Sequence, residues 1–215
     1  MSTLAEVMAG VAVDMTAFHD ELNRLDAVAG DGDLGNTVSV GAKAVLAAID
    51  ASHDADQATM LHRCGTDLAT GAPSTVGTLT ARGMLAAARA LGTASGESPV
   101  MLLHRGFAAA LAAIQSAGKA APGDKTLIDA LAPAVTALSV RAEAGSPLPQ
   151  ALSAAAAAAR LGAQHTRDMT PRAGRARWLV QRSQGAEDAG AHFIALVLES
   201  AARRLDDMHE GPAPR

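Results

Sequence analysis

Apolar side chains recur every three or four residues along most of the chain, and this spacing restricts the fold to packed helices. The first stretch shows the pattern most clearly, with apolar residues at alternating steps of four and three: Leu4, Met8, Val11, Met15, Phe18, Leu22 and Leu25. Side chains spaced in this way lie on one face of an α-helix. No segment shows the apolar–polar alternation of a strand, and no hairpin turn joins two apolar runs. We therefore predict an all-α fold.

The same pattern predicts about eight helices joined by short connections. The first runs to Ala29, and the others cover approximately residues 36–49, 57–69, 79–90, 103–114, 127–138, 149–164 and 188–205. Short connections favour antiparallel neighbours, so alternate loops lie at the same end. A chain of 215 residues suits one domain. We expect that domain to span residues 1–208, followed by a flexible C-terminal tail at 209–215.

Composition excludes several classes of function. The formal net charge is −4, and the aromatic side chains are limited to Phe18, Phe107, Phe193 and Trp178. Such a chain lacks the basic surface and the stacking platforms of nucleic-acid-binding proteins. Cys64, the only cysteine, falls in an apolar helical pattern and is expected to be an inert core thiol. No signal peptide or membrane span is predicted, so we expect a cytoplasmic protein without a membrane partner.

The most informative local feature is a cluster of aspartates at the end of the first predicted helix. Asp26, Asp31 and Asp33 lie within eight residues, interspersed with glycines and without a nearby lysine or arginine downstream. Three carboxylates this close repel one another unless a cation lies between them. Asp31 and Asp33 alone would suit a solvated turn, but Asp26 is anchored on a rigid helix. The sequence predicts a Mg²⁺ site with these three ligands.

Other readings of the aspartate loop fail on their structural context. Residues 30–35 spell G-x-G-x-x-G, but a helix precedes them where a dinucleotide site requires a strand. Counting twelve positions from Asp31 reaches Ala42, where an EF-hand requires glutamate. No P-loop motif is present. The helix N-terminus predicted near Asn36 offers amides and a dipole to phosphate, so the site suits a nucleotide di- or triphosphate.

Three blocks of sequence occur in an order and spacing that identify a family. They are residues 25–35, then Gly118-Lys119 with 122–129, then 174–176 with 187–191. Together they resemble the nucleotide-binding L subunit of the dihydroxyacetone kinase family over nearly the whole chain. The resemblance implies a single-domain antiparallel eight-helix barrel that holds ADP or ATP in the loops at one end through two Mg²⁺ ions. It also implies that Asp26, Asp31 and Asp33 are the metal ligands.

By the same resemblance, a set of loop residues matches the nucleotide-binding positions of the family. They are Leu34, Gly35, Asn36, Thr37, Ala72, Ser74, Gly118, Leu127, Arg175, Asp188, Ala189 and Gly190. Taken alone, Leu127 would be a core residue, Arg175 a surface charge and Asp188 an N-cap. The chain departs from the family at three places: Leu34 replaces a common histidine, Ala189 replaces a common proline, and the loop from Gly71 to Gly77 is about one residue shorter and contains Pro73.

The family resemblance implies a phosphotransferase subunit that acts on an alcohol group only with a partner. In the family, a separate K subunit holds a small ketose, so dihydroxyacetone or erythrulose is expected, within glycerol metabolism. No catalytic residue is expected on this chain beyond the Mg-phosphate site. The donor is either ATP or a held ADP recharged by a phosphotransferase-system protein, and we expect a homodimer or hetero-oligomer. The alternatives are a nucleotide-loaded regulatory module without phosphotransfer activity and a kinase acting on a carrier-bound acyl group.

Overall fold

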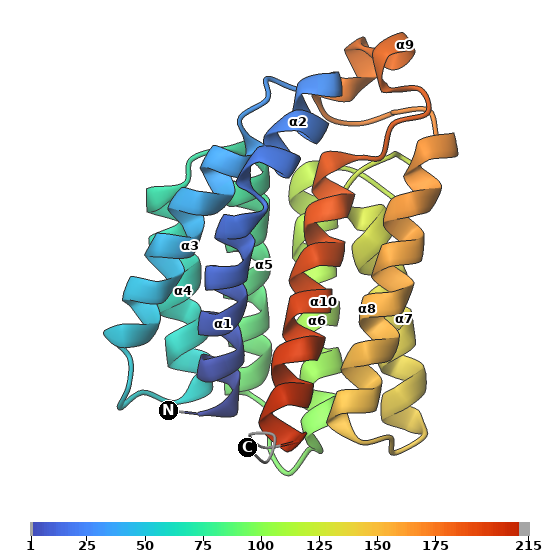
Figure 1. Cartoon of the computed structure of the whole chain (residues 1–215). Coiled ribbons are helices and arrows are strands. Elements are labelled where there is room, and N and C mark those ends of the chain that lie inside the picture. The colour runs from blue at the N-terminus through green and yellow to red at the C-terminus, as the bar shows by residue number, and fades with distance from the viewer. Residues whose placement is uncertain (1, 211–215) are drawn as a thin grey trace, which may run out of the picture.

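Eight long helices form a closed ring in the computed structural model of the chain (Figure 1). The structure describes residues 2–210, apart from the side chains of Arg175 and Glu210. The ring helices are α1 (Thr3–Ala17), α3 (Leu34–Asp50), α4 (Gln57–Gly71), α5 (Thr75–Gly92), α6 (Pro99–Gly118), α7 (Ile128–Glu143), α8 (Leu148–His165) and α10 (Ala189–Glu210). Each packs against the next, and α10 packs against α1. The expected all-α barrel is confirmed, and no strand occurs among the described residues.

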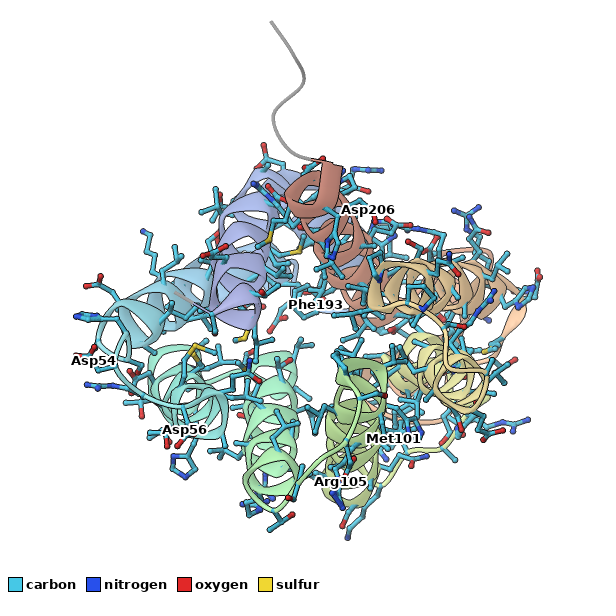
Figure 2. All side chains as sticks on the ribbon, turned by 90° about the horizontal axis from the view of Figure 1, so that it is seen from below. Asp54, Asp56, Met101, Arg105, Phe193 and Asp206 are labelled. Carbon is cyan, nitrogen blue, oxygen red and sulfur yellow. The ribbon has the colours of Figure 1, made fainter. Side chains whose placement is uncertain are left out.

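Small residues allow the ring helices to approach closely. The core cluster between α7, α8 and α10 consists mainly of alanines, most of them fully buried. Gly162 of α8 lies so near α7 that a Cβ added there would be 2.1 Å from the carbonyl oxygen of Asp129. Seen end-on, Phe193 of α10 lies inside the ring (Figure 2), and its side chain is buried. The alanine-rich sequence therefore builds a wall of closely packed helices.

The predicted first helix is wrong in one respect, because it is two helices. α1 ends at Ala17, and α2 (His19–Ala29) continues in a different direction (Figure 1). Between them Phe18 has φ −93° and ψ 11°, and its N–H donates to the carbonyl oxygen of Met15 at 3.2 Å. Two acidic side chains in the first turn of α2 favour a new helix start. The apolar stripe conceals the break because Leu22 still faces the same core cluster as Met15.

Other boundaries differ from the predictions by small amounts. The second predicted helix begins at Leu34, two residues before Asn36, with Asp33 in the cap position. The stretch predicted to be irregular contains η1 (Thr166–Asp168), η2 (Arg175–Trp178) and α9 (Val180–Ser183). Of the predicted tail, His209 and Glu210 lie within α10, while 211–215 lie outside the described residues.

The alternate loops gather at one end of the ring, as predicted. The connections at residues 30–33, 72–74, 119–127 and 166–188 all lie at the end that carries α2 and α9 (Figure 1). α1 begins, and α10 ends, at the opposite end. The fold therefore brings segments from four parts of the sequence to a single face, which we call the loop end.

Cys64 is fully buried between α1, α3 and α4, as the helical pattern predicted. Burial and the nearby Asp67 raise the pKa of the Cys64 thiol to about 11. The thiol is therefore protonated near neutral pH, and the expected inert core cysteine is confirmed.

One helix of the described chain, α6, is long and apolar enough to cross a membrane by length and composition alone. In this fold it is part of the ring wall, packed between α5 and α7. Its Phe107 and Leu111 pack against core clusters of the ring. Only Val100, Gly106 and Ile114 of this helix are buried.

Candidate functional site

The loop after α2 folds around the carboxylate of Asp26. Asp26 Oδ2 accepts the backbone N–H of Gly32 at 2.8 Å and that of Asp33 at 3.1 Å. Gly30 is required here, because a Cβ at that position would lie 2.2 Å from Asp26 Oδ1. Gly32 has a φ of 77°, in the left-handed region that glycine adopts without strain. The glycines thus let the loop close tightly on the last turn of α2.

The three predicted metal ligands come together at this loop. Asp26, Asp31 and Asp33 each offer a carboxylate oxygen, and these oxygens all lie within 4.8 Å of one another. Asp31 and Asp33 are exposed, whereas Asp26 is partly buried. A divalent cation accepts several oxygen ligands at once and relieves the repulsion between them. The geometry suits the predicted Mg²⁺ site.

The start of α3 is held against α2 by two polar side chains that sequence reasoning missed. Asn23 Oδ1 accepts the N–H of Gly35 at 2.6 Å, and His19 Nε2 lies 2.7 Å from Asn36 Oδ1. Their spacing is the missed signal, because His19, Asn23 and Asp26 lie on one face of α2. Leu34, predicted to bind nucleotide, directs its side chain into the core. Only its main chain is available to an anion at the helix start.

The second loop is a tight turn beside the first. Ala72 is buried, and its carbonyl oxygen accepts the N–H of Ser74 at 2.8 Å. Ser74 caps α5, since its Oγ accepts the N–H of Gly77 at 3.0 Å. A Cβ on Gly77 would lie 2.1 Å from the Ala72 carbonyl oxygen. Val76 packs into the same cluster as Leu34, so the structure brings the two predicted nucleotide loops together.

The third and fourth loops adjoin one another around Leu127. Gly118 is the last residue of α6, and Leu127 is the buried residue before α7. A Cβ on Gly190 would lie 3.2 Å from both Leu127 Cβ and Asp188 Oδ1. Ala189, the first residue of α10, is also buried. Leu127 is thus both a core residue and a neighbour of the last predicted nucleotide loop.

Asp188 links the last loop to the aspartate cluster electrostatically. Its Oδ1 accepts the N–H of Ala191 at 2.7 Å, so it caps α10, and its own N–H donates to Thr166 Oγ1 at 2.8 Å. Burial raises the pKa of the Asp188 carboxyl to about 7, with further contributions from Asp129 and Asp26. Perturbed carboxyls of this kind concentrate at functional sites. Asp188 therefore carries less negative charge near neutral pH than an exposed aspartate, and a cation bound nearby would favour its ionised form.

Arg175 is the first residue of η2, and its side chain lies outside the described part of the structure. The surrounding stretch covers the loop end through other contacts. The N–H of Arg172 donates to the Asp124 carbonyl oxygen at 3.0 Å, and Arg182 Nη2 donates to that of Ala27 at 3.1 Å. Residues between α8 and α10 are thereby attached to both the third loop and α2.

Lys125 and Asp129 are two further residues of this end, which the sequence analysis placed in the block 122–129 without giving either a role of its own. Lys125 is 3% exposed, and its Nζ donates to the carbonyl oxygens of Ser183 and Ala186, both at 2.8 Å. Burial lowers the pKa of its ammonium group. The carboxylate of buried Asp129 accepts the N–H of Thr126 at 2.7 Å. Together they fix the third loop and tie it to the stretch before α10.

Replacing Lys125 by methionine is expected to lower the free energy of unfolding by about 1–3 kcal/mol, because two buried carbonyls lose their donor. Urea denaturation measures this loss, and faster tryptic cleavage after Arg182 would report the loosened loop. Lys119→Met is the matched control. Lys119 is exposed, and its backbone has a left-handed conformation like that of Lys125, with φ of 50° and 61° respectively. Equal stability of the two variants would contradict the role given to Lys125.

The chain matches the family model described as the DAK2 domain over residues 28–203. The chain belongs to the DAK2 domain family. The match begins two residues after Asp26 and extends from the last turn of α2 into α10. Most of the ring and all four loops of the loop end therefore lie within this DAK2 domain.

Curated relatives of this DAK2 domain are kinases. It is 38% identical over 194 residues to the L-erythrulose kinase of Pectobacterium atrosepticum. This match covers 86% of this chain and 32% of that protein. It is 33% identical over 182 residues to the ADP-binding subunit of the PEP-dependent dihydroxyacetone kinase of Escherichia coli, covering 84% of this chain and 86% of the subunit. The chain thus spans about a third of the erythrulose kinases that it matches.

A solved structure shares the fold of this DAK2 domain. It is the crystal structure of the dihydroxyacetone kinase of C. freundii in complex with AMP-PNP and Mg²⁺, with a TM-score of 0.74 and 28% sequence identity. The superposition covers 94% of this chain and 34% of that kinase. The resemblance to the L subunit of dihydroxyacetone kinases is confirmed, and the chain is a domain of this kinase family. The roles of individual residues remain predictions.

Proposed function

We propose that this domain binds ADP or ATP through two Mg²⁺ ions and donates a phosphoryl group to a small ketose held by a separate K partner. The carboxylate cluster of Asp26, Asp31 and Asp33, with oxygens within 4.8 Å of one another beside the start of α3, carries this proposal. Relatives named as kinases of erythrulose and dihydroxyacetone support a short ketose as acceptor. The neighbour in complex with AMP-PNP and Mg²⁺ supports the nucleotide and the metal.

Each part of the loop end has a distinct task in this proposal. The three aspartates hold the cations, and the first turn of α3 presents backbone amides to the polyphosphate. The turn at Ala72 and Ser74 borders the phosphates from α4 and α5. Gly118 and Leu127 border the adenosine, and the final loop packs closely on Leu127 at Gly190, where a Cβ would lie 3.2 Å from Leu127 Cβ. When bound, Mg²⁺ would neutralise the charge that develops on the transferred phosphoryl group.

The chemical step needs little beyond positioning from this chain. A hydroxyl oxygen of the ketose forms a bond to the terminal phosphorus, and the bond between that phosphorus and the bridging oxygen of ATP breaks, releasing ADP. The hydroxyl proton leaves to a base on the partner or to solvent. The cluster contributes by keeping the phosphate in line with an incoming hydroxyl at the exposed loop end. If the donor is a held ADP, the phosphoryl group is first delivered to it by a phosphotransferase-system protein.

A reconstituted assay tests the proposal. The purified chain is mixed with a K subunit, Mg-ATP and either dihydroxyacetone or erythrulose, and ketose phosphate is followed by chromatography. We expect product only when the chain, the K subunit and Mg²⁺ are all present. A parallel reaction with ADP, phosphoenolpyruvate and phosphotransferase-system proteins identifies the donor. Absence of product with every K subunit and ketose, despite nucleotide binding, would count against the kinase.

A nucleotide-loaded regulatory module is the second candidate, and the second loop favours it. The turn contains Pro73, Ala72 is buried and the Ser74 hydroxyl is already engaged as a helix cap. These features leave the second loop fewer groups for a transferable phosphate. Nucleotide binding without product in the reconstituted assay is the result this candidate predicts. A homodimeric or hetero-oligomeric state and a cytoplasmic location remain predictions from the sequence.

A further inference from the structure

The helix that carries Asp26 needs lateral support, because the break at Phe18 separates α2 from the continuous wall of the ring. Leu22 anchors one face of α2 in the core, where it is fully buried. A polar contact holds α2 to α10: Glu21 Oε1 lies 2.8 Å from His192 Nε2. His192 is only 8% exposed. The direction of α2, and hence the position of Asp26, depends partly on this contact.

The other ring nitrogen of His192 contacts the segment before α10. His192 Nδ1 lies 2.8 Å from Glu187 Oε1, and the Glu187 side chain is only 4% exposed. Glu187 is fixed in turn by Arg167, whose Nη2 lies 2.9 Å from Oε2, and by Arg160, whose Nη1 lies 3.7 Å from Oε1. Asp188, the cap of α10, follows Glu187 directly. His192 thus joins the metal-bearing helix to the last predicted nucleotide loop.

The network extends to Glu199 through Arg160. Glu199 forms two hydrogen bonds with Arg160, at 2.7 and 2.6 Å, and Arg160 Nη1 also lies 3.2 Å from His192 Nδ1. The carboxylates of Glu21, Glu187 and Glu199 thus face two guanidinium groups and one imidazole. Hydrogen bonds between guanidinium and carboxylate groups are charge-assisted, which makes them shorter and stronger than neutral ones, and partial burial protects them from solvent.

We propose that His192 is a positioning residue that fixes α2, and with it Asp26, against the loop that precedes α10. This inference rests on the proposed function, since the site being positioned is the Mg-nucleotide site. Groups that orient a metal ligand without touching the metal commonly change affinity about 10–100-fold when they are removed. The network therefore sets the nucleotide affinity of the loop end in addition to stabilising the fold.

The chain contains a second polar tie of the same kind, which serves as a control. Asp14 on α1 accepts a hydrogen bond from Ser200 Oγ on α10 at 2.6 Å and pairs with Arg204. Arg204 lies twelve residues beyond His192, or about 18 Å farther along the helix. Asp14→Ala therefore removes a carboxylate that joins an N-terminal helix to α10, as Glu21→Ala does, but away from the loop end.

The test compares Glu21→Ala, His192→Leu and Asp14→Ala by calorimetric titration with Mg-ADP and by hydrogen exchange of the metal-free chain. For the first two variants we expect Mg-ADP affinity to fall about tenfold and amide exchange in α2 to rise. For Asp14→Ala we expect a comparable loss of thermal stability, with affinity within about twofold of the wild type. If His192→Leu fails to fold, Glu21→Ala decides, because Glu21 is the more exposed partner.

Each result has a defined meaning. If Glu21→Ala and His192→Leu both fold and the amide hydrogen exchange of α2 is unchanged in both, the positioning role is overturned. This holds at any measured Mg-ADP affinity. Faster α2 exchange with wild-type Mg-ADP affinity would also overturn it, because the network would then be structural only. A wild-type chain that binds no Mg-ADP would refute the proposed function instead. In that case the exchange of α2 still decides whether His192 holds the helix.

Discussion

Replacing Asp31 by alanine is expected to abolish Mg²⁺-dependent ADP binding while leaving the fold intact. Asp31 is exposed and lies between two glycines, so its removal disturbs no core packing and changes stability by no more than about 0.5 kcal/mol. Its carboxylate oxygen lies within 4.8 Å of those of Asp26 and Asp33. Removing a group that only orients a metal ligand lowers metal affinity about 10–100-fold. Removing a ligand itself is therefore expected to lower the affinity at least about 100-fold.

Calorimetric titration with ADP at fixed Mg²⁺ measures the effect of Asp31→Ala, and titration with Mg²⁺ at fixed ADP separates metal from nucleotide. The control is Asp54→Ala, which removes the same charge from an exposed loop that Figure 2 shows at the end opposite the site. That variant is expected to bind like the wild type. If Asp31→Ala binds ADP and Mg²⁺ with wild-type affinity, the cluster is not the metal site.

Replacing Gly35 by alanine is expected to damage both stability and binding. A Cβ there would lie 2.0 Å from the carbonyl oxygen of His19 and 2.8 Å from Asn23 Oδ1. The first is a backbone atom, so α2 and α3 must move apart, and the hydrogen bond from Gly35 to Asn23 is lost. Overpacking typically costs 1–3 kcal/mol, and a backbone clash places this variant at about 3 kcal/mol or more. The melting temperature is expected to fall by roughly 6–12 °C.

Gly106→Ala is the matched control for Gly35→Ala, because both glycines are buried and helical. A Cβ at Gly106 would be 3.7 Å from Ala87 Cβ, an ordinary contact. Alanine favours a helix interior over glycine by about 1 kcal/mol, so this variant is expected to be as stable as the wild type or more so. Calorimetric melting and Mg-ADP titration compare the two. A Gly35→Ala protein that melts and binds like Gly106→Ala would show that α2 and α3 need no close approach.

The features that the sequence predicted correctly are those encoded over short distances. Apolar spacing identified most of the helices that form the ring, and the aspartate cluster was visible because its members lie within eight residues. The glycines interspersed among the aspartates were equally visible, and Gly30 and Gly32 have the close approach and backbone angle that a tight loop requires. Local patterns of this kind carry their own geometry, so no tertiary knowledge was needed.

The features that were missed depend on tertiary contacts or on a change of direction without a change of pattern. Lys125 donates to carbonyls 58 and 61 residues later in the chain, and His192 contacts a carboxylate 171 residues earlier. Nothing in the residues flanking Lys125 or His192 indicates such partners. The break at Phe18 was missed because the apolar stripe keeps its phase through the turn. A periodic pattern indicates which face is buried and does not reveal a change in the direction of the helix axis.

The ring contains an even number of alternating helices, and this parity decides where the chain ends lie. An even number of passes returns the chain to the end at which it entered, so α1 begins and α10 ends on the face remote from the carboxylates (Figure 1). α10 has 22 residues, which corresponds to about 33 Å between the two faces. Tags, surface attachments or fused domains joined to either end are therefore attached away from the loop end and leave the aspartate cluster accessible.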